Sequence, residues 1–315
     1  MTVGITLSPA PAANAVDSYV ELATFAAEAG VGTVWVAQFF DVDALSVAAV
    51  IGHQVPDISI GTAVVPTYPR HPLVVASQAA TAQAASGGRF QLGIGLGSRP
   101  LVEQAYGVST DRAIRHLREY LTVLRTVLSA GSVDFHGETL TAVTPMPVAV
   151  AGATKPPPLL VGSAAGTQVL RVAGELADGV FSFLAGPQTI ADVIAPCLAK
   201  ASSGVGRDDP RIIAVIPAVV TSDVAGVKAT AAEQLAFYDG VPAAQKSVAR
   251  EGIEHAHEMA IIGDEAHVSS AIDEYFDAGA TEVSIAYSHI STAEDHRRTI
   301  SLAGQLNQRR TALAK

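Results

Sequence analysis

One segment of this chain combines residues that could hold a flat, negatively charged ligand. The stretch AVVPTYPRHP, residues 63–72, ends an apolar strand with closely spaced prolines. Pro66 cannot donate to a sheet and the later prolines stiffen the bend, so this strand end could present its backbone to a planar ring. The prolines could equally define a loop, and Arg70 and His71 could either bind an anion or stabilise that loop. Tyr68 is a candidate catalytic proton donor.

Small residues mark the ends of two later strands. In GIGLGS, residues 93–98, alternating glycines could let backbone amides approach a ligand, although glycines also gather at tight barrel corners. Arg99, just beyond, could neutralise a phosphate. In VGSAAGT, residues 161–167, small residues lead into a helix whose free amides and positive dipole end suit a phosphate, with hydroxyl groups from Ser163 and Thr167. Thr167 could instead be only the N-cap of that helix.

The remaining reactive side chains are scattered. His116 lies on an amphipathic helix and is assigned a structural role, whereas Tyr287 and His289 follow the last strand, where a catalytic side chain would stand. We count His289 as a second catalytic candidate. No zinc-binding histidine pair, Walker loop or GxSxG motif is present, so no metal site is expected. Cys197 is the only cysteine and is expected to be a buried helix residue.

The composition narrows the class of protein. The 315 residues are 49% hydrophobic and only 16% charged, with a formal net charge of −10. An acidic chain without a basic cluster argues against nucleic-acid partners and against docking on anionic membranes. The N-terminus lacks the pattern of a signal peptide, and no apolar run is long enough to span a bilayer. We therefore expect a cytoplasmic protein that acts on a small molecule.

Short apolar runs alternate with helical patterns along the whole chain. About eight such units predict a single (β/α)8 barrel domain over 1–315, with a surface excursion at 132–158 and a helical insertion at 225–260. A doubly wound sheet is the rival, disfavoured because the first strand is not followed by a glycine fingerprint. The expected strands are 3–7, 33–36, 58–65, 90–94, 159–162, 179–183, 212–220 and 282–286.

Several of these segments together match a known family. GTAVVPTYPRHPLVVASQAATAQAASGGRFQLGIGLGS, residues 61–98, resembles the hallmark of the bacterial-luciferase-like monooxygenase superfamily, in particular its coenzyme F420-dependent oxidoreductases. AEAGVGTVWV looks like the second strand of that family, VGSAAGTQVLRVAGELADGVF like its fifth and sixth strands, and GDEAHVSSAIDEYFDAGATEVSI like its closing helix and last strand. The Arg-His-Pro, Ser-Gly-Gly-Arg and Ala-Asp-Gly elements carry the resemblance.

The resemblance implies a TIM barrel with F420, or alternatively FMN, at its C-terminal mouth, usually in a homodimer. A non-prolyl cis peptide facing the deazaflavin ring would fall at Ala63-Val64. The other implied cofactor contacts follow the second strand at Gln38, the fourth strand at Leu96, Gly97 and Ser98, and the fifth strand at Ser163, Ala165, Gly166, Thr167, Gln168 and Val169.

The chain departs from the family pattern after its second strand. F420-dependent sugar-phosphate and alcohol dehydrogenases carry an Asp-His pair where this chain has Gln38-Phe39, and the sugar-phosphate enzymes place a glutamate where it has Ser98. The resemblance therefore implies an F420-dependent oxidoreductase that passes a hydride between the deazaflavin C5 and a small, apolar organic substrate, such as an enone or imine, beside Phe39 and Phe40. The alternatives are an FMN-dependent monooxygenase and a non-catalytic F420- or flavin-binding protein.

Overall fold

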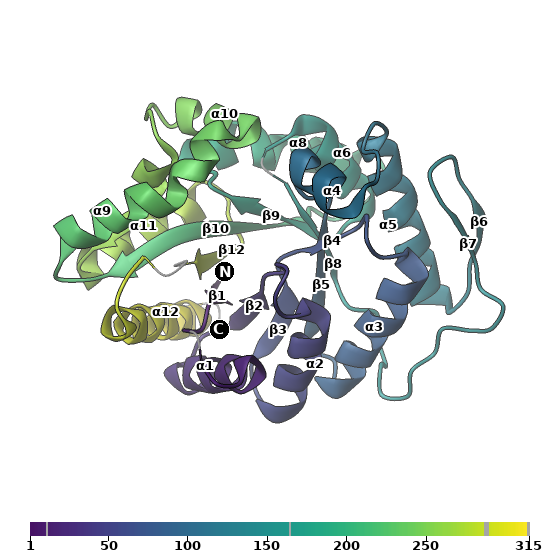
Figure 1. The fold of residues 1–315 in the computed structure, drawn as a ribbon, viewed down its shortest axis with the longest axis horizontal. Coiled ribbons are helices and arrows are strands. Elements are labelled where there is room, and N and C mark those ends of the chain that lie inside the picture. Colours follow the sequence, from purple (N-terminus) through teal and green to yellow (C-terminus); the bar gives the residue numbers. More distant parts are fainter. Residues whose placement is uncertain (11, 164, 287–289, 314–315) are drawn as a thin grey trace.

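A closed parallel sheet forms the centre of the molecule (Figure 1). The computed structural model describes residues 1–10, 12–163, 165–286 and 290–313. Within these ranges eight strands pair in sequence and the last returns to the first, which confirms the (β/α)8 barrel and excludes the doubly wound sheet. In barrel order they are β1 (Thr2–Leu7), β2 (Thr33–Val36), β3 (Ser59–Thr62), β5 (Phe90–Gly95), β8 (Leu159–Gly162), β9 (Gly179–Phe183), β10 (Arg211–Val220) and β12 (Glu282–Ala286).

Helices surround the barrel and connect each strand to the next along the chain. They are α1 (Ala15–Ala29), α2 (Ala44–Gln54), α3 (Pro72–Ala85), α4 (Arg99–Tyr106), α5 (Ala113–Ala130), α6 (Thr167–Leu176), α7 (Pro187–Thr189), α8 (Ala195–Ser203), α9 (Val224–Leu235), α10 (Pro242–Arg250), α11 (Glu265–Asp277) and α12 (Ala293–Leu313). Shorter turns are η1 (Ile190–Ile194), a π-helix, and the 3-10 segments η2 (Ala236–Gly240) and η3 (Ala256–Met259). None of the helices in the described ranges is both long and apolar enough to cross a bilayer.

Two elements lie where no element was expected. The helix α4 follows β5 directly and is only eight residues long, with Val102 as its one buried residue, so its sequence is too short to give a clear helical pattern. The strand β11 (Ile261–Gly263) is only three residues long and pairs with the outer end of β10. Both elements lie outside the barrel. The strand β11 can pair with β10 because β10 continues past the residues that pair with β12.

The inside of the barrel is filled by a small apolar cluster. Trp35 on β2 meets Phe181 on β9 edge to face, with ring centroids 4.6 Å apart. Leu160, Ile213 and Val215 pack around them. The residues between these positions on each strand point outward into the much larger core beneath the helices. Each strand is therefore buried on both faces, as expected for a parallel barrel.

A polar network closes the amino-terminal end of the barrel. Glu282, 1% exposed, accepts hydrogen bonds from Trp35 Nε1 at 2.7 Å and from Arg211 Nη2 at 2.8 Å. Arg211 Nη1 also donates to Gln91 Oε1 at 2.5 Å. Glu282, Arg211 and Gln91 lie at or next to the starts of their strands, and the indole of Trp35, the third residue of β2, reaches Glu282. Burial raises the pKa of Glu282, although Arg211 and Trp35 oppose that shift.

The excursion at 132–158 carries an antiparallel hairpin that projects beyond α5 (Figure 1). Its strands, β6 (Asp134–His136) and β7 (Thr141–Val143), flank the glycine turn expected there. Glu119 on α5, 6% exposed, accepts hydrogen bonds from Glu138 N at 3.0 Å and from Thr139 N at 2.8 Å. A Cβ atom on Gly137 would lie 2.4 Å from the Glu119 carboxylate, so a larger residue there would displace that carboxylate. The hairpin is thus fixed to α5 by one buried carboxylate.

The helical insertion is attached in the same manner. Glu251, which follows α10, accepts hydrogen bonds from Gln188 N at 3.2 Å and from Thr189 N and Oγ1 at 2.8 and 2.6 Å. It therefore caps the short helix that follows β9. Gly186 leaves room for this carboxylate, since a Cβ there would lie 2.3 Å from it.

We predict that Arg211→Met destabilises the protein by about 3–5 kcal/mol at neutral pH, since it leaves the buried Glu282 carboxylate without its cation. A carboxyl group with a raised pKa binds its proton more tightly in the folded chain. Its stabilising contribution is therefore present at low pH and is lost as the pH rises through that pKa. The variant should be closer to the wild type at pH 5 than at pH 8. Trp35, the only tryptophan, reports urea unfolding from within the network.

The double variant Arg211→Met with Glu282→Gln is the matched control, because removing the charge should recover part of the lost stability. A single variant within about 0.5 kcal/mol of the wild type, the scatter typical of surface substitutions, would contradict the assignment of this network.

Candidate functional site

The carboxyl end of β3 is irregular in the way the resemblance implies. The peptide bond between Ala63 and Val64 is cis, as expected. Before it, Thr62 Oγ1 donates to Gly93 O at 2.9 Å and accepts from Gly93 N at 3.0 Å, so a side chain replaces the ladder where β3 stops. After it, β4 (Val65–Pro66) resumes pairing with β5. Residues 63 and 64 therefore bulge from the sheet between two paired segments.

The glycines of the neighbouring strands make room for this bulge. A Cβ on Gly93 would lie 1.9 Å from the Thr62 carbonyl oxygen, and a Cβ on Gly95 would lie 2.6 Å from Val64 Cγ2. A Cβ on Gly162, at the end of β8, would lie 3.0 Å from the same Val64 Cγ2 atom. The space on the Cβ side of Gly93 and Gly95 is therefore filled by protein, which fits the alternative that glycines gather where a barrel packs tightly. The approach of their backbone amides to a ligand stays a prediction.

The residues after β5 lie at the rim of the barrel. Leu96 is half-buried, whereas Gly97 and Ser98 are exposed. Gly97 has φ +74°, a conformation that favours glycine, and it turns the chain into α4. Ser98 is the N-cap residue of α4 but makes no capping hydrogen bond with its side chain. Their exposed backbone is open to a ligand.

The start of α6 has the features of an anion site. Its N-cap is Gly166, and no side chain caps the helix, so the alternative that Thr167 is merely the N-cap is wrong. Gly166, Thr167 and Gln168 are exposed, Val169 is half-buried, and no atom lies within 4 Å of a Cβ built on Gly166. Ala165 adopts the left-handed conformation, φ +56°. Residue 164 lies outside the described residues.

A buried hydroxyl beside this helix end is unsatisfied. Ser163 is 7% exposed, and its Oγ atom has no hydrogen-bond partner among the described residues. A buried hydroxyl without a partner is costly, so such an atom marks a place where a missing group fits. Free helix amides and an unpaired hydroxyl are the donors that a phosphate requires. The donor set at 163–169 therefore fits a phosphate group.

The side chain of Gln38 makes four hydrogen bonds to nearby residues. Its amide nitrogen donates to Phe39 O at 2.7 Å and to Val42 O at 3.0 Å, and its Oε1 accepts from Ala44 N at 3.0 Å and from Arg70 at 3.2 Å. The amide thus organises the loop after β2. This loop leaves the side chains of Phe39 and Phe40 about two-thirds exposed at the barrel mouth.

Arg70 and His71 were predicted either to bind an anion or to stabilise the loop, and their contacts support stabilisation of the loop. Arg70 pairs with Asp43 at 2.5 Å, and His71 caps α3 through Nδ1, which accepts from Leu73 N at 3.3 Å. Arg99 is also occupied, since it pairs with Glu103 at 3.0 Å and with Asp111 at 2.8 Å. With two carboxylates around it, Arg99 supplies no net positive charge for a phosphate.

Tyr68 lies in the bend directly after the bulge. Its hydroxyl is buried and has no hydrogen-bond partner within the described part of the chain. Burial and the Glu103 carboxylate raise the pKa of Tyr68, against an opposing effect of Arg99. The phenol therefore keeps its proton at neutral pH. The other catalytic candidate, His289, and the neighbouring Tyr287 lie outside the described residues.

His116 is the functional candidate that the sequence reasoning missed. Its ring stacks on Tyr68, with centroids 4.4 Å apart and an interplanar angle of 11°, and its Nε2 lies 3.1 Å from Thr67 Oγ1. A topological signal was available. In a barrel of this kind the helices run antiparallel to the strands, so the first turn of α5 must lie at the carboxyl ends of the strands.

Two elements of the resemblance have structural roles at the opposite end of the barrel. Arg89 donates to the carbonyl oxygens of Gly52, Val55 and Ile58, which join α2 to β3. Asp178 accepts from Leu159 N at 2.8 Å and from two arginines, and so links β8 to its neighbours. The Ser-Gly-Gly-Arg and Ala-Asp-Gly elements therefore identify the fold rather than its chemistry.

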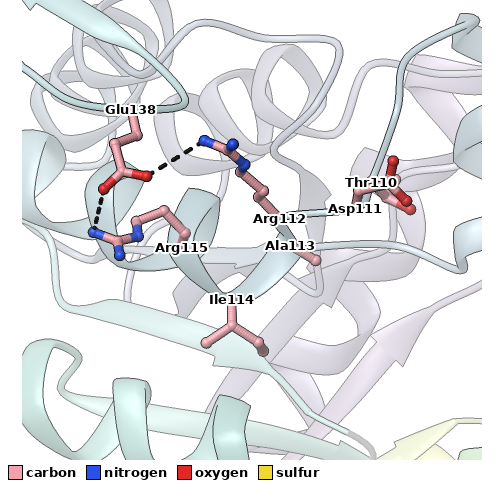
Figure 2. Close-up of a pocket in the computed structure, with 7 residues that line it drawn as sticks. All are labelled: Thr110, Asp111, Arg112, Ala113, Ile114, Arg115 and Glu138. Carbon is pink, nitrogen blue, oxygen red and sulfur yellow. Dashed lines mark hydrogen bonds and ion pairs between the residues drawn. The ribbon is translucent and has the colours of Figure 1, made fainter.

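A shallow pocket of about 400 Å³ lies elsewhere, at the start of α5 (Figure 2). Arg112 and Arg115 both reach Glu138 of the hairpin there, at 3.3 and 3.0 Å. None of the predicted site residues lines it. Both ion pairs join α5 to the hairpin, so these contacts help to attach the hairpin.

The described candidates instead gather at the mouth of the barrel. They follow β2, β3, β5 and β8, which are consecutive in the sheet. The carboxyl ends of parallel strands share one edge, so these residues face a common space. The bulge follows β3, and the anion site lies two strands further on, after β8.

Comparison with known proteins is consistent with this architecture. A family model described as luciferase-like monooxygenase matches residues 1–300. A 5,10-methylenetetrahydromethanopterin reductase of Methanolobus tindarius is 27% identical over 236 residues, which are 75% of this chain and 70% of that protein.

Two solved structures share the fold. A coenzyme F420 dependent tetrahydromethanopterin reductase from Methanopyrus kandleri has a TM-score of 0.81 and 22% identity, covering 98% of this chain and 99% of the other. The oxygenating constituent of a diketocamphane monooxygenase of Pseudomonas putida, in complex with FMN, has a TM-score of 0.78 and 15% identity, covering 98% of each chain. Because the family model spans nearly the whole sequence, this chain belongs to the luciferase-like monooxygenase family.

Proposed function

We propose that this protein is an F420-dependent oxidoreductase that acts on a small, apolar substrate at the mouth of its barrel. The observation that carries the proposal is the pairing of two features at the ends of β3 and β8, which are separated in the sheet by β5 alone. One is the bulge at Ala63-Val64. The other is the unpaired Ser163 hydroxyl beside the uncapped start of α6.

The separation of these two features suits one ligand. Adjacent strands lie about 4.8 Å apart, so the ends of β3 and β8, with β5 between them, are separated by roughly 10 Å. A ring at the bulge would need a short sugar chain to carry its phosphate to the helix end. That is the construction of both F420 and FMN, and the coenzyme F420 dependent reductase that shares this fold favours F420.

When bound, the deazaflavin supplies or accepts a hydride at its ring C5. Ala63 and Val64 would form the wall behind the ring, and Val64 is held between Gly95 and Gly162. Leu96, Gly97 and Ser98 would flank the sugar chain with exposed backbone. Ala165, Gly166, Gln168 and Val169, with the hydroxyls of Ser163 and Thr167, would hold the phosphate.

Apolar side chains at the rim indicate the substrate class. Phe39 and Phe40 are 67% and 66% exposed, and Phe40 contacts Tyr106 of α4 with ring centroids 6.1 Å apart. No acid-base pair stands after β2, because the Gln38 amide serves the loop. The Tyr68 phenol would therefore donate the proton that accompanies hydride transfer to an enone or imine.

The first test is binding. We expect the absorbance and fluorescence of F420 to change on addition of the protein, with a Kd below about 100 μM. Titration with FMN runs in parallel. Binding of reduced FMN in clear preference to F420 would replace the proposal with the monooxygenase alternative, and absence of any F420 signal up to that concentration would contradict it.

The second prediction concerns the anion site. Ser163→Ala should weaken F420 binding about three- to tenfold, since a charge-assisted hydrogen bond is lost. It should leave unchanged the binding of the phosphate-free deazaflavin riboside. Fluorescence titration of both ligands measures the difference.

Ser182→Ala is the matched control, because Ser182 is also a buried serine without a partner in the described residues but lies within β9. Cys197 allows an independent measurement of ligand binding at this helix end. Its Sγ atom lies 3.8 Å from Thr167 O, and it is the only cysteine. F420 should slow its reaction with a thiol reagent. Equal effects of the two serine variants would argue against a phosphate at Ser163.

The third prediction concerns the proton donor. Tyr68→Phe should lower kcat by about 10²-fold, in the range of general acid catalysis, while the Kd for F420 stays within about twofold. Because its raised pKa keeps the phenol protonated, the wild-type kcat should not fall between pH 7 and 9 through loss of this donor. Steady-state rates on a panel of enones, imines and alcohols provide the measurement. An unchanged kcat in the variant would remove Tyr68 from the mechanism.

A further inference from the structure

The imidazole of His116 makes two contacts with the segment that leaves the bulge. It stacks on the ring of Tyr68 at 4.4 Å, and its Nε2 lies 3.1 Å from the hydroxyl of Thr67. Thr67 is 1% exposed, and its backbone nitrogen donates to Gly95 O at 2.9 Å. One side chain of α5 thus contacts both residues that follow β4.

The surroundings of His116 hold the imidazole in place. Tyr120, one turn later on α5, has its ring 5.6 Å from His116 and donates its hydroxyl to Arg70 O at 3.0 Å. Burial lowers the pKa of His116, with a smaller opposing effect of Glu119, so the ring is neutral at pH 7. A neutral imidazole can pack face to face on a phenol without the cost of burying a charge.

Tyr68 depends on this packing for its orientation. Its hydroxyl has no hydrogen-bond partner among the described residues, so no polar contact there fixes the phenol. Within the described part of the chain, the aromatic ring that packs on Tyr68 is the imidazole of His116. A shift of His116 would therefore move the Tyr68 hydroxyl relative to the bulge at Ala63-Val64.

We propose that His116 is a positioning residue, which acts through Tyr68 by stacking on its ring and through Thr67 by a hydrogen bond. The proposal rests on the proposed function, since it assigns His116 to the proton donor of that reaction. His116 does not itself touch the reacting atoms. Its stack sets where the phenol stands, and its hydrogen bond fixes the end of the segment from which the phenol projects.

The two contacts can be separated by substitution. His116→Phe keeps a ring for the stack and loses the hydrogen bond, whereas His116→Ala loses both. Thr67→Val removes the hydrogen bond from the other side and leaves the stack. His53→Gln, at an exposed histidine near the end of α2, is the control for loss of a histidine.

We expect kcat to fall at least tenfold in His116→Ala and less than about threefold in His116→Phe and Thr67→Val, with the control unchanged. The Kd for F420 should stay within about threefold of the wild type in all of them, and thermal melting shows whether each variant is folded. In the Tyr68→Phe background, His116→Ala should cause no further loss of kcat, because it acts through the missing hydroxyl.

The outcomes separate this inference from the proposed function. If the wild type does not bind F420, or binds it without turnover on the substrate panel, the proposed oxidoreductase function fails and the inference falls with it. If the wild type turns over and His116→Ala retains its kcat, the inference alone is overturned. Equal losses in the Ala and Phe variants, or additive losses with Tyr68→Phe, would likewise reject positioning through the stack.

Discussion

The structure of the mouth depends on one steric constraint, which is the space beside the end of β3. Thr62 and Val64 can lie where they do because β5 and β8 carry no side chains at Gly93, Gly95 and Gly162. The Thr62 hydroxyl then replaces the missing ladder bonds to Gly93. Given this space, the strand can break, bulge and resume as β4 without leaving the barrel. The bend that carries Tyr68 follows from that path.

The two ends of the barrel differ in how completely their polar groups are satisfied. At the amino-terminal end, Glu282, Arg211, Gln91 and the Trp35 indole are joined in one network. At the carboxyl end, the hydroxyls of Tyr68 and Ser163 are buried without partners in the described residues. The carboxyl end therefore retains unused hydrogen-bonding capacity in these two hydroxyls, as expected where a ligand binds.

Much of this could be predicted from the sequence, and the failures have physical causes. The alternation of apolar runs gave the barrel, and the position of the cis peptide followed from the family resemblance. The role of Gly93 and Gly95 could not be predicted, because it depends on which neighbouring side chain fills the space. The partners of Arg70 and Arg99 are set by tertiary contacts. His116 was missed because the amphipathic pattern of α5 says that a residue faces inward but not what it meets there.

The helix α5 joins features that are remote in sequence. It carries Glu119, which holds the hairpin turn, and one turn earlier His116, which stacks on Tyr68. The hairpin is therefore connected to the bend through less than one helical turn of rigid backbone. Its attachment constrains the bend more directly than its distance along the chain suggests.

Backbone and small side chains form most of the inner site, which comprises the wall at 63–64, the exposed turn at 97 and the helix end at 166. The rim, by contrast, is made of large side chains on loops, with Phe39 and Phe40 after β2 and Tyr106 on α4. Substitutions at the rim therefore change exposed side chains that do not form the inner site. Descendants of such a protein could therefore exchange one substrate for another by point mutation while keeping the same cofactor, and the barrel is suited to diversification within a lineage.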